Sequence, residues 1–211
     1  MLPDKTQLAA DLFNRHAKAY QDKYTDVSLY HDGFDLFCSH IGKENPDVLE
    51  LACGPGNITR YLLAKRPDLR ILGIDLAPNM LELAGIACPE AEFRQMDVRM
   101  ISELDQRYDG IMCGFALPYL SKEEAIAFIC DASALLKERG VLYISTMEGD
   151  YGQSGFQQSS SGDQVYIHYH EAGYLTEALA AQGFHVIAVQ RKVAPGHEGT
   201  PHPDLVILAG K

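Results

Sequence analysis

The segment from Val48 to Asn57, Val-Leu-Glu-Leu-Ala-Cys-Gly-Pro-Gly-Asn, combines residues well suited to binding a small ligand. Its apolar start predicts a buried strand, which runs into a turn at Gly54 and Gly56 and then into a helix. Glycine lets a ligand approach the backbone closely, and the first turn of a helix offers N–H groups without partners. Taken alone, the segment has a less favoured alternative explanation, which is an ordinary connection between a strand and a helix.

Two carboxylates sharpen this prediction, because each ends a further predicted strand. Asp75 closes the next strand, 19 residues beyond Gly56, where an acidic side chain can accept both hydroxyls of a ribose. Asp97, in Met96-Asp97-Val98, follows the third strand and is suited to accept the exocyclic amine of adenine, although a helix cap would also explain it. Together the three features predict a site for an adenosine-containing ligand.

A nicotinamide dinucleotide is the obvious competing ligand, but its binding fingerprint requires G-x-G-x-x-G/A. Gly54 and Gly56 fill the first two positions, whereas Thr59 occupies the third. The start of this helix therefore lacks the small residue that packs closely beneath a pyrophosphate. The pattern favours an adenosine ligand without phosphates.

The elements that carry these residues predict an α/β fold. From residue 47 onward, short apolar runs alternate with helical patterns, which is typical of βαβ units on a parallel sheet. We expect a doubly wound, mostly parallel sheet with an antiparallel last strand. The seven strands are expected at residues 47–52, 70–75, 91–96, 108–113, 140–146, 184–190 and 205–209. The helices between them are expected at residues 58–65, 78–88, 122–137 and 171–182.

Residues 1–44 are expected to form amphipathic helices that cover another part of the protein, and residues 45–211 are expected to form the α/β domain. One apolar stripe runs through Leu8, Leu12, His16 and Tyr20, and a cleaner one begins at Tyr30 and ends at Ile41. Residues 149–163 are rich in Gly, Ser and Gln and predict a flexible lid or loop, and residues 191–203 predict another loop.

Composition excludes several classes of function. The formal net charge of −11 and the scattered basic residues oppose binding to nucleic acid or to an anionic membrane. Five cysteines without a CxxC pair argue against a disulfide framework or a zinc site, and we expect no metal. No signal peptide or membrane-spanning segment is recognisable, so a cytoplasmic location is expected. The oligomeric state is open, and aromatic residues on the N-terminal helices would suit a homodimer contact.

These motifs resemble, as a set, the class I S-adenosylmethionine (SAM)-dependent methyltransferases that act on small molecules. Glu50-Leu-Ala-Cys-Gly-Pro-Gly56 is similar to the family's acidic-x-Gly-x-Gly-x-Gly loop, with Ala52 at the usual first glycine. Asp75 and Met96-Asp97-Val98 resemble the family's ribose and adenine sites. The stretch from Asp109 to Tyr119 resembles its fourth strand and following loop, and Gly140-Val-Leu-Tyr-Ile-Ser its fifth strand.

The resemblance implies a Rossmann-like fold, SAM as the cofactor, and an N-terminal helical cap formed by residues 1–44 over the cofactor site. Residues at the first loop would hold the methionine end, Asp75 and Leu76 the ribose, and Asp97 and Val98 the adenine. Phe115 would lie near the sulfur. The complete set of implied cofactor-binding residues is Glu50, Ala52, Gly54, Gly56, Asn57, Asp75, Leu76, Met80, Met96, Asp97, Val98 and Phe115.

The implied reaction is in-line transfer of the SAM methyl group to a small soluble acceptor, giving S-adenosylhomocysteine. A general base is needed only for a protonated acceptor, and His168 is the favoured candidate among several histidines that include His31, His197 and His202. Possible acceptor-binding residues are Tyr20, Tyr24, Tyr30, Tyr119 and His170, although packing would also explain them.

The acceptor atom and the activity itself are left open. Ala116-Leu-Pro-Tyr119 departs from the Asn/Asp-Pro-Pro-Tyr pattern of related enzymes that methylate amino groups of bases or proteins, which disfavours that class. Oxygen, carbon, sulfur and small amines remain possible. A non-catalytic SAM-binding sensor or partner subunit is the main alternative, and a nucleotide-dependent oxidoreductase is a weaker one.

Overall fold

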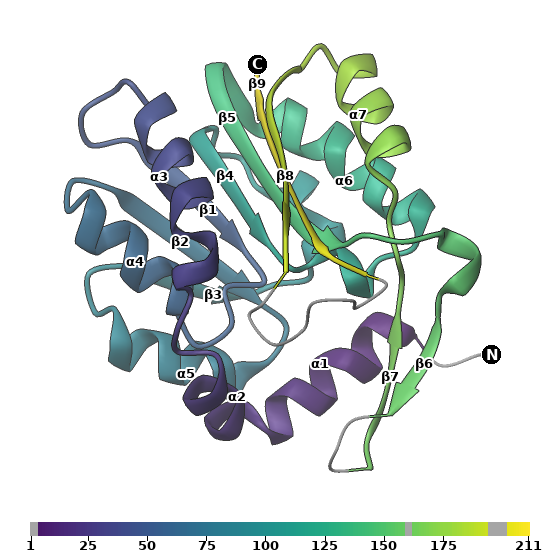
Figure 1. Cartoon of the computed structure of the whole chain (residues 1–211). Coiled ribbons are helices and arrows are strands. Elements are labelled where there is room, and N and C mark those ends of the chain that lie inside the picture. The colour runs from purple at the N-terminus through teal and green to yellow at the C-terminus, as the bar shows by residue number, and fades with distance from the viewer. Residues whose placement is uncertain (1–3, 159–161, 194–201) are drawn as a thin grey trace.

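A central seven-stranded sheet organises the molecule in a computed structural model that describes residues 4–158, 162–193 and 202–211 (Figure 1). The strand order is β3-β2-β1-β4-β5-β9-β8, and only β9 runs antiparallel to its neighbours within this sheet. The strands are β1 (Asp47–Leu51), β2 (Arg70–Asp75), β3 (Glu92–Gln95), β4 (Tyr108–Gly114), β5 (Leu136–Met147), β8 (His185–Lys192) and β9 (Asp204–Gly210). The predicted α/β fold class and the antiparallel last strand are confirmed.

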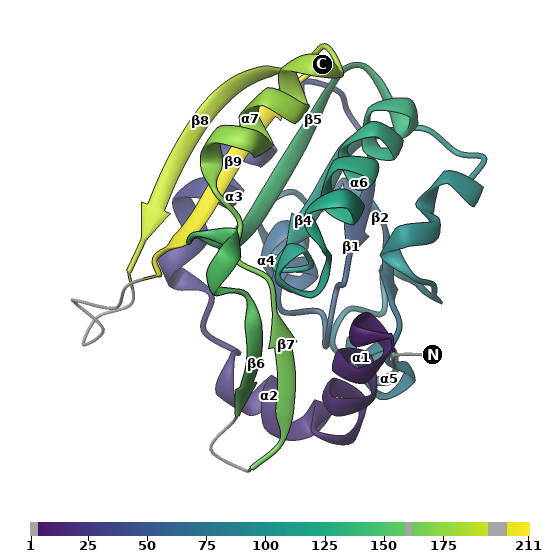
Figure 2. The same ribbon diagram turned by 90° about the vertical axis from the view of Figure 1, so that its right-hand side faces the viewer.

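Helices cover both faces of the sheet, as two views at right angles show (Figures 1 and 2). On one face, α3 (His31–His40) and α4 (Asn57–Lys65) pack against side chains such as Val48 and Tyr143. On the other face, η2 (Val98–Glu103), α6 (Lys122–Leu135) and α7 (Ala172–Ala181) cover the opposite side chains of the same strands. Strands buried on both faces are expected to be apolar throughout, which is why their sequences lack a strict alternation.

The helix ends largely follow local sequence. Ser121 and Glu124 form a capping box at the start of α6, and Pro78 occupies the first turn of α5 (Pro78–Ala87). The prediction that α6 continues to residue 137 is wrong, because α6 ends at Leu135 and β5 begins directly at Leu136. Gly140 lies inside β5, and Arg139 takes the left-handed conformation with φ 62°, next to an irregular register with β4.

The N-terminal segment divides between two locations. Its elements are α1 (Lys5–Arg15), α2 (Ala17–Lys23), the short η1 (Ser28–Tyr30) and α3. Both α1 and α2 contact α5 and lie at the edge of the sheet where the parallel strands end, whereas α3 packs on the sheet face (Figures 1 and 2). The stripe that ends at Ile41 is buried, but Leu8 of the first stripe is 38% exposed, because α1 turns its alanines Ala9 and Ala10 inward instead.

The strand β6 (Gly155–Gln158) lies within the segment expected to be a lid or loop, and it pairs with β7 (Gln164–Ile167), which directly follows that segment. Residues 159–161, within that segment, and residues 194–201, within the second predicted loop, lie outside the described residues. Beside α1, β7 packs close enough for the Lys5 ammonium to sit 3.3 Å from the Tyr166 ring centre. Within the described part of the chain, no helix is long and apolar enough to cross a membrane.

Candidate functional site

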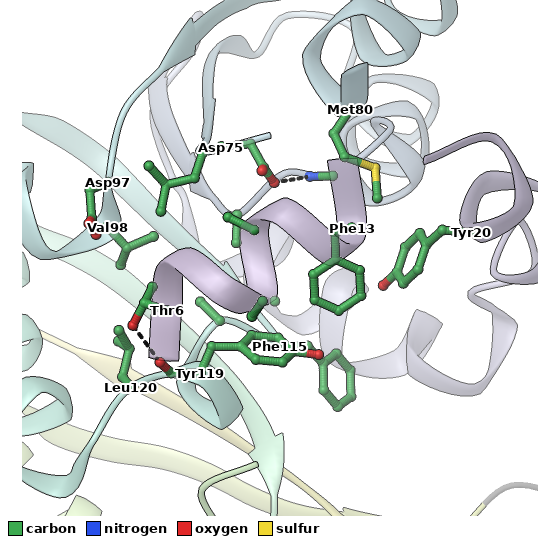
Figure 3. Close-up of a pocket in the computed structure, with 17 residues that line it drawn as sticks. Thr6, Phe13, Tyr20, Asp75, Met80, Asp97, Val98, Phe115, Tyr119 and Leu120 are labelled. Carbon is green, nitrogen blue, oxygen red and sulfur yellow. Dashed lines mark hydrogen bonds between the residues drawn. The ribbon is translucent and has the colours of Figure 1, made fainter. Parts of the chain in front are cut away.

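A pocket lies beneath α1 at the carboxyl ends of β1, β2 and β4 (Figure 3). The space between its lining atoms amounts to about 750 Å³, and this figure includes space that is open to solvent. The lining residues are Thr6, Ala9, Ala10, Phe13, Tyr20, Ala52, Gly54, Asp75, Leu76, Met80, Asp97, Val98, Gly114, Phe115, Ala116, Tyr119 and Leu120. Eight of the twelve residues predicted to bind the cofactor belong to this lining.

The glycine-rich turn places bare backbone at the pocket wall. Ala52 and Gly54 both have left-handed backbone, with φ 50° and 53°, and both line the pocket. A Cβ atom added to Gly54 would meet no other atom within 4 Å, so this glycine leaves room for a ligand. Gly56, with φ 80°, instead faces α5, where an added Cβ would lie 3.3 Å from Cα of Ala84.

Asp75 ties this turn to the end of β2. Its Oδ2 accepts a hydrogen bond from the Gly54 N–H at 2.9 Å, and its Oδ1 accepts one from the Ala77 N–H at 2.8 Å. Burial raises the pKa of Asp75 above its ordinary value, although these backbone donors oppose the shift. A carboxylate has about four acceptor positions, so Asp75 retains acceptor positions for hydroxyl groups of a ligand.

Asp97 lines the pocket beside Val98 and is held by Arg99. The guanidinium of Arg99 donates to both carboxylate oxygens of Asp97, the shortest distance being 2.6 Å between Nη2 and Oδ2. The Arg99 backbone N–H also donates to Oδ1 at 2.8 Å, so Asp97 caps the short η2 helix as well as facing the pocket.

Four of the residues predicted to bind the cofactor lie outside the lining. Glu50 is 1% exposed and accepts a hydrogen bond from the Thr59 hydroxyl at 2.7 Å, and burial raises its pKa to about 8. Gly56 is the N-cap residue of α4, and the next residue, Asn57, donates from Nδ2 to the Tyr24 carbonyl at 2.7 Å. Met96 packs against the core. These residues support the turn from behind.

Aromatic rings form the other end of the pocket. Phe13 packs edge-on against Tyr20 and Tyr119, with ring centres 5.4 and 5.2 Å apart, and Phe115 lines the same pocket. Burial raises the pKa of Tyr20 to about 12. Phe115 has the left-handed φ of 57°, which is rare for an aromatic residue, and its N–H donates to the Ser145 hydroxyl at 3.1 Å. Tyr20 and Tyr119, both predicted acceptor residues, thus lie together.

The other predicted acceptor residues lie outside the lining. Tyr24 is 45% exposed and packs on Tyr20, with ring centres 4.5 Å apart. Tyr30 contacts Phe115, with ring centres 5.3 Å apart, and its hydroxyl donates to Asp204. His170 is fully buried, with Nε2 2.8 Å from the Leu117 carbonyl oxygen and Nδ1 hydrogen-bonded to the Tyr174 hydroxyl.

His168, the predicted base, lies behind the short η3 helix (Leu117–Tyr119) and not in the pocket lining. It is 5% exposed, and its backbone N–H donates to the Pro118 carbonyl at 2.8 Å. Its Nδ1 is buried without a hydrogen-bond partner among the described residues. Burial lowers its pKa.

The remaining candidate histidines are dispersed. His31 stacks on Tyr61 and His202 stacks on Tyr169, with ring centres 4.1 and 4.0 Å apart. His197 lies outside the described residues. Over residues 4–158, 162–193 and 202–211, no group of three or more His, Cys, Asp and Glu side chains is arranged to hold a metal ion.

Sequence reasoning predicted an N-terminal cap but missed the individual residues of α1 that line the pocket. Thr6, Ala9, Ala10 and Phe13 line the pocket, and the Thr6 hydroxyl donates to the Tyr119 carbonyl at 2.8 Å (Figure 3). The available signal was the spacing of Thr6, Ala9, Ala10 and Phe13, which places these residues on one face of a helix. Gly114, Ala116 and Leu120, from the end of β4 and the loop after it, were also missed.

Comparisons with known proteins agree with this architecture. Residues 48–140 match the family described as methyltransferase domain. The chain is 39% identical over 98 residues to a trans-aconitate 2-methyltransferase of Enterobacter sp. (strain 638), covering 46% of this chain and 38% of that protein. It is 30% identical over 159 residues to a malonyl-[acyl-carrier protein] O-methyltransferase of Priestia megaterium, covering 74% of this chain and 55% of that protein. The chain spans about half, or less, of the length of these curated relatives.

A solved structure extends the likeness to nearly the whole fold. The Burkholderia thailandensis 1,6-didemethyltoxoflavin-N1-methyltransferase, with bound 1,6-didemethyltoxoflavin and S-adenosylhomocysteine, superposes with a TM-score of 0.72. It is 24% identical and covers 97% of this chain and 88% of its own. The family match over residues 48–140, these relatives and the common fold show that the chain is similar to the class I SAM-dependent methyltransferases.

Proposed function

We propose that the protein binds SAM in the pocket beneath α1 and transfers its methyl group to a small acceptor by in-line displacement, releasing S-adenosylhomocysteine. The observation that carries this proposal is the convergence of Gly54, Asp75 and Asp97 on one pocket. Open backbone, a carboxylate with free acceptor positions and a second carboxylate beside apolar Val98 match the needs of a methionine chain, a ribose and an adenine.

The residues that fit the cofactor divide by role. Ala52 and Gly54 would face the methionine end, Asp75 and Leu76 the ribose, and Asp97 and Val98 the adenine, with Met80 as an apolar wall. Glu50, Gly56, Asn57 and Met96 would act from behind the turn and the strand ends. The carboxylates of Asp75 and Asp97 also suit a ligand that carries a positive charge, as SAM does on its sulfonium.

The aromatic end of the pocket suits the acceptor. Among the described residues that line the pocket, Asp75 and Asp97 are the charged ones, and Phe13, Tyr20, Phe115 and Tyr119 offer rings instead. Rings favour a small acceptor with a flat or apolar body. The 1,6-didemethyltoxoflavin bound to the Burkholderia thailandensis relative supports an acceptor of that size.

SAM, when bound, supplies a methyl group on a sulfonium that is already an activated leaving group. The protein's own task is then to hold the acceptor atom in line with the methyl group and to keep water out. Positioning of this kind contributes up to about 7–11 kcal/mol in the best oriented reactions. The rings and α1 would provide it, and His168 remains the predicted base for an acceptor that arrives protonated.

Calorimetric titration with SAM and with S-adenosylhomocysteine tests the cofactor proposal. The wild type should bind both, and Asp75→Asn should bind both roughly 10–100-fold more weakly, because a hydrogen bond to a charged group contributes about 1.5–3 kcal/mol. Asp11→Asn, on the exposed side of α1, is the matched control. Wild-type protein that binds neither ligand would refute the proposal. Transfer of a labelled methyl group to candidate acceptors then separates an enzyme from a non-catalytic SAM-binding protein.

A further inference from the structure

Arg99 joins three acidic side chains from separate parts of the fold. Its guanidinium contacts Asp97 at the end of β3, Asp4 before α1 and Glu124 in the first turn of α6. The distances are 2.6 Å to Asp97, 2.7 Å to Asp4 and 3.2 Å to Glu124. Asp4 lies 95 residues from Arg99 in sequence, so this junction exists only in the folded protein.

The contacts with Asp97 occupy most of its carboxylate. The backbone N–H of Arg99 donates to Oδ1, Nε is shared between Oδ1 and Oδ2, and Nη2 donates to Oδ2. A carboxylate has about four acceptor positions, and three N–H donors leave about one of them free. Asp97 lines the pocket, so Arg99 determines which part of the carboxylate is available to a ligand.

The contacts with Asp4 hold the start of α1. Asp4 caps this helix by accepting hydrogen bonds from the Thr6 and Gln7 N–H groups, at 2.9 and 3.3 Å. The next turns of α1 supply Thr6, Ala9, Ala10 and Phe13 to the pocket. The same guanidinium therefore contacts both the floor of the pocket, at Asp97, and the helix that covers it.

Charge explains why an arginine is suited to this position. Asp4, Asp97 and Glu124 converge on one cation, and their carboxylates would repel one another without it. The hydrogen bonds that Arg99 donates to these carboxylates, above all to Asp97, raise the pKa of Arg99, so the group stays charged. The planar fork of arginine can serve several carboxylates at once, whereas lysine offers a single point charge.

We propose that Arg99 is a positioning residue for cofactor binding, which leaves one acceptor position of Asp97 free for the adenine amine and couples that carboxylate to the position of α1 over the pocket. This inference rests on the proposed binding of SAM in the pocket. Arg99 itself is absent from the pocket lining, so it acts through Asp97 and Asp4.

A double-mutant cycle with SAM as the probe tests the connection to Asp97. Arg99→Lys keeps the charge and loses the fork, so the calorimetric affinity for SAM should fall about tenfold. In an Asp97→Asn background, the same Arg99→Lys change should weaken binding by less than about threefold, because its target is already altered. A merely structural role of Arg99 would give equal losses in the two backgrounds, and that result would overturn the proposal.

Asp4→Asn tests the connection to α1 with little risk to folding, since asparagine is also a good N-cap. Amide hydrogen exchange over residues 5–15 should rise by an order of magnitude or more, and the affinity for SAM should fall severalfold. Glu124→Gln, which preserves the capping box, should change both quantities less than Asp4→Asn does. Unchanged exchange and affinity in Asp4→Asn would overturn the coupling, whereas wild-type protein that binds no SAM would refute the proposed function itself.

Discussion

The hydroxyl of Tyr30 donates a hydrogen bond to Oδ2 of Asp204 at 2.6 Å, linking the start of α3 to the start of β9. The two residues are 174 positions apart in the sequence. The ring of Tyr30 also contacts Phe115, so the pair braces the aromatic end of the pocket from outside. Burial raises the pKa of Asp204, and the Tyr30 hydroxyl opposes that rise by stabilising the ionised carboxylate.

Tyr30→Phe should therefore cost more stability at pH 8 than at pH 4. The pKa of Asp204 is raised in the folded protein, so the free energy of unfolding decreases as pH rises through that pKa. This decrease becomes larger when the Tyr30 hydroxyl is removed, because the hydroxyl stabilises the ionised carboxylate. We expect the free energy of unfolding to fall by about 1 kcal/mol at pH 8 and by less at pH 4, in urea titrations. Tyr24→Phe, at an exposed tyrosine, is the control. A pH-independent cost would contradict this account.

Glu50→Gln should stabilise the protein progressively as pH rises, relative to the wild type. The pKa of Glu50 is raised from 4.5 to about 8 by burial, so its favourable contribution is complete below pH 4.5 and is lost towards pH 8. Each pKa unit corresponds to about 1.4 kcal/mol, so the difference between variant and wild type should grow by at least that amount between pH 4.5 and pH 8. Urea unfolding at several pH values measures it, with the exposed Glu44→Gln as the control. A difference that stays flat over this range would show that Glu50 is ionised throughout.

Gly54→Ala and Gly56→Ala should separate ligand binding from stability. Both residues have positive φ, so each alanine carries backbone strain of roughly 1–2 kcal/mol. The Gly54→Ala methyl group enters open pocket space and should weaken SAM binding at least tenfold, whereas the Gly56→Ala methyl group meets Ala84 and should lower the melting temperature more. Calorimetry and thermal unfolding distinguish the two effects. Equal SAM affinities in the two variants would argue against a ligand at Gly54.

His168 should titrate below pH 6.5 and be neutral at pH 7.5. Burial and the nearby Lys5 both lower its pKa, so the contribution of this group to stability is complete above pH 6.5 and declines as pH falls below it. Imidazole NMR signals, assigned with His168→Gln, report the pKa directly. A neutral imidazole can accept a proton, and loss of a general base would slow labelled methyl transfer by roughly 10²–10⁴-fold. If His168→Gln keeps the wild-type rate, His168 is not the general base.

The sequence alone determined the succession of the main-sheet strands and their helices along the chain, and it identified three residues that meet at one pocket. Gly54, Asp75 and Asp97 each follow a predicted parallel strand, and the carboxyl ends of such strands share one edge of the sheet. Short, continuous apolar runs identified the buried strands, because a strand covered on both faces carries apolar side chains throughout. The boundary at residue 136 was missed because α6 passes into β5 without a turn residue at the junction.

Only the tertiary structure decided which side chains cover the pocket and which side chains lie behind its wall. Contacts between distant segments fix these positions. They place Phe13 at the pocket, Arg99 between Asp97 and Asp4, and Glu50 behind the turn. Helical periodicity shows which face of α1 is apolar or small, but not which surface that face will meet. Packing of α1 across the strand ends supplied that information, because a side chain's partners are set by the whole fold.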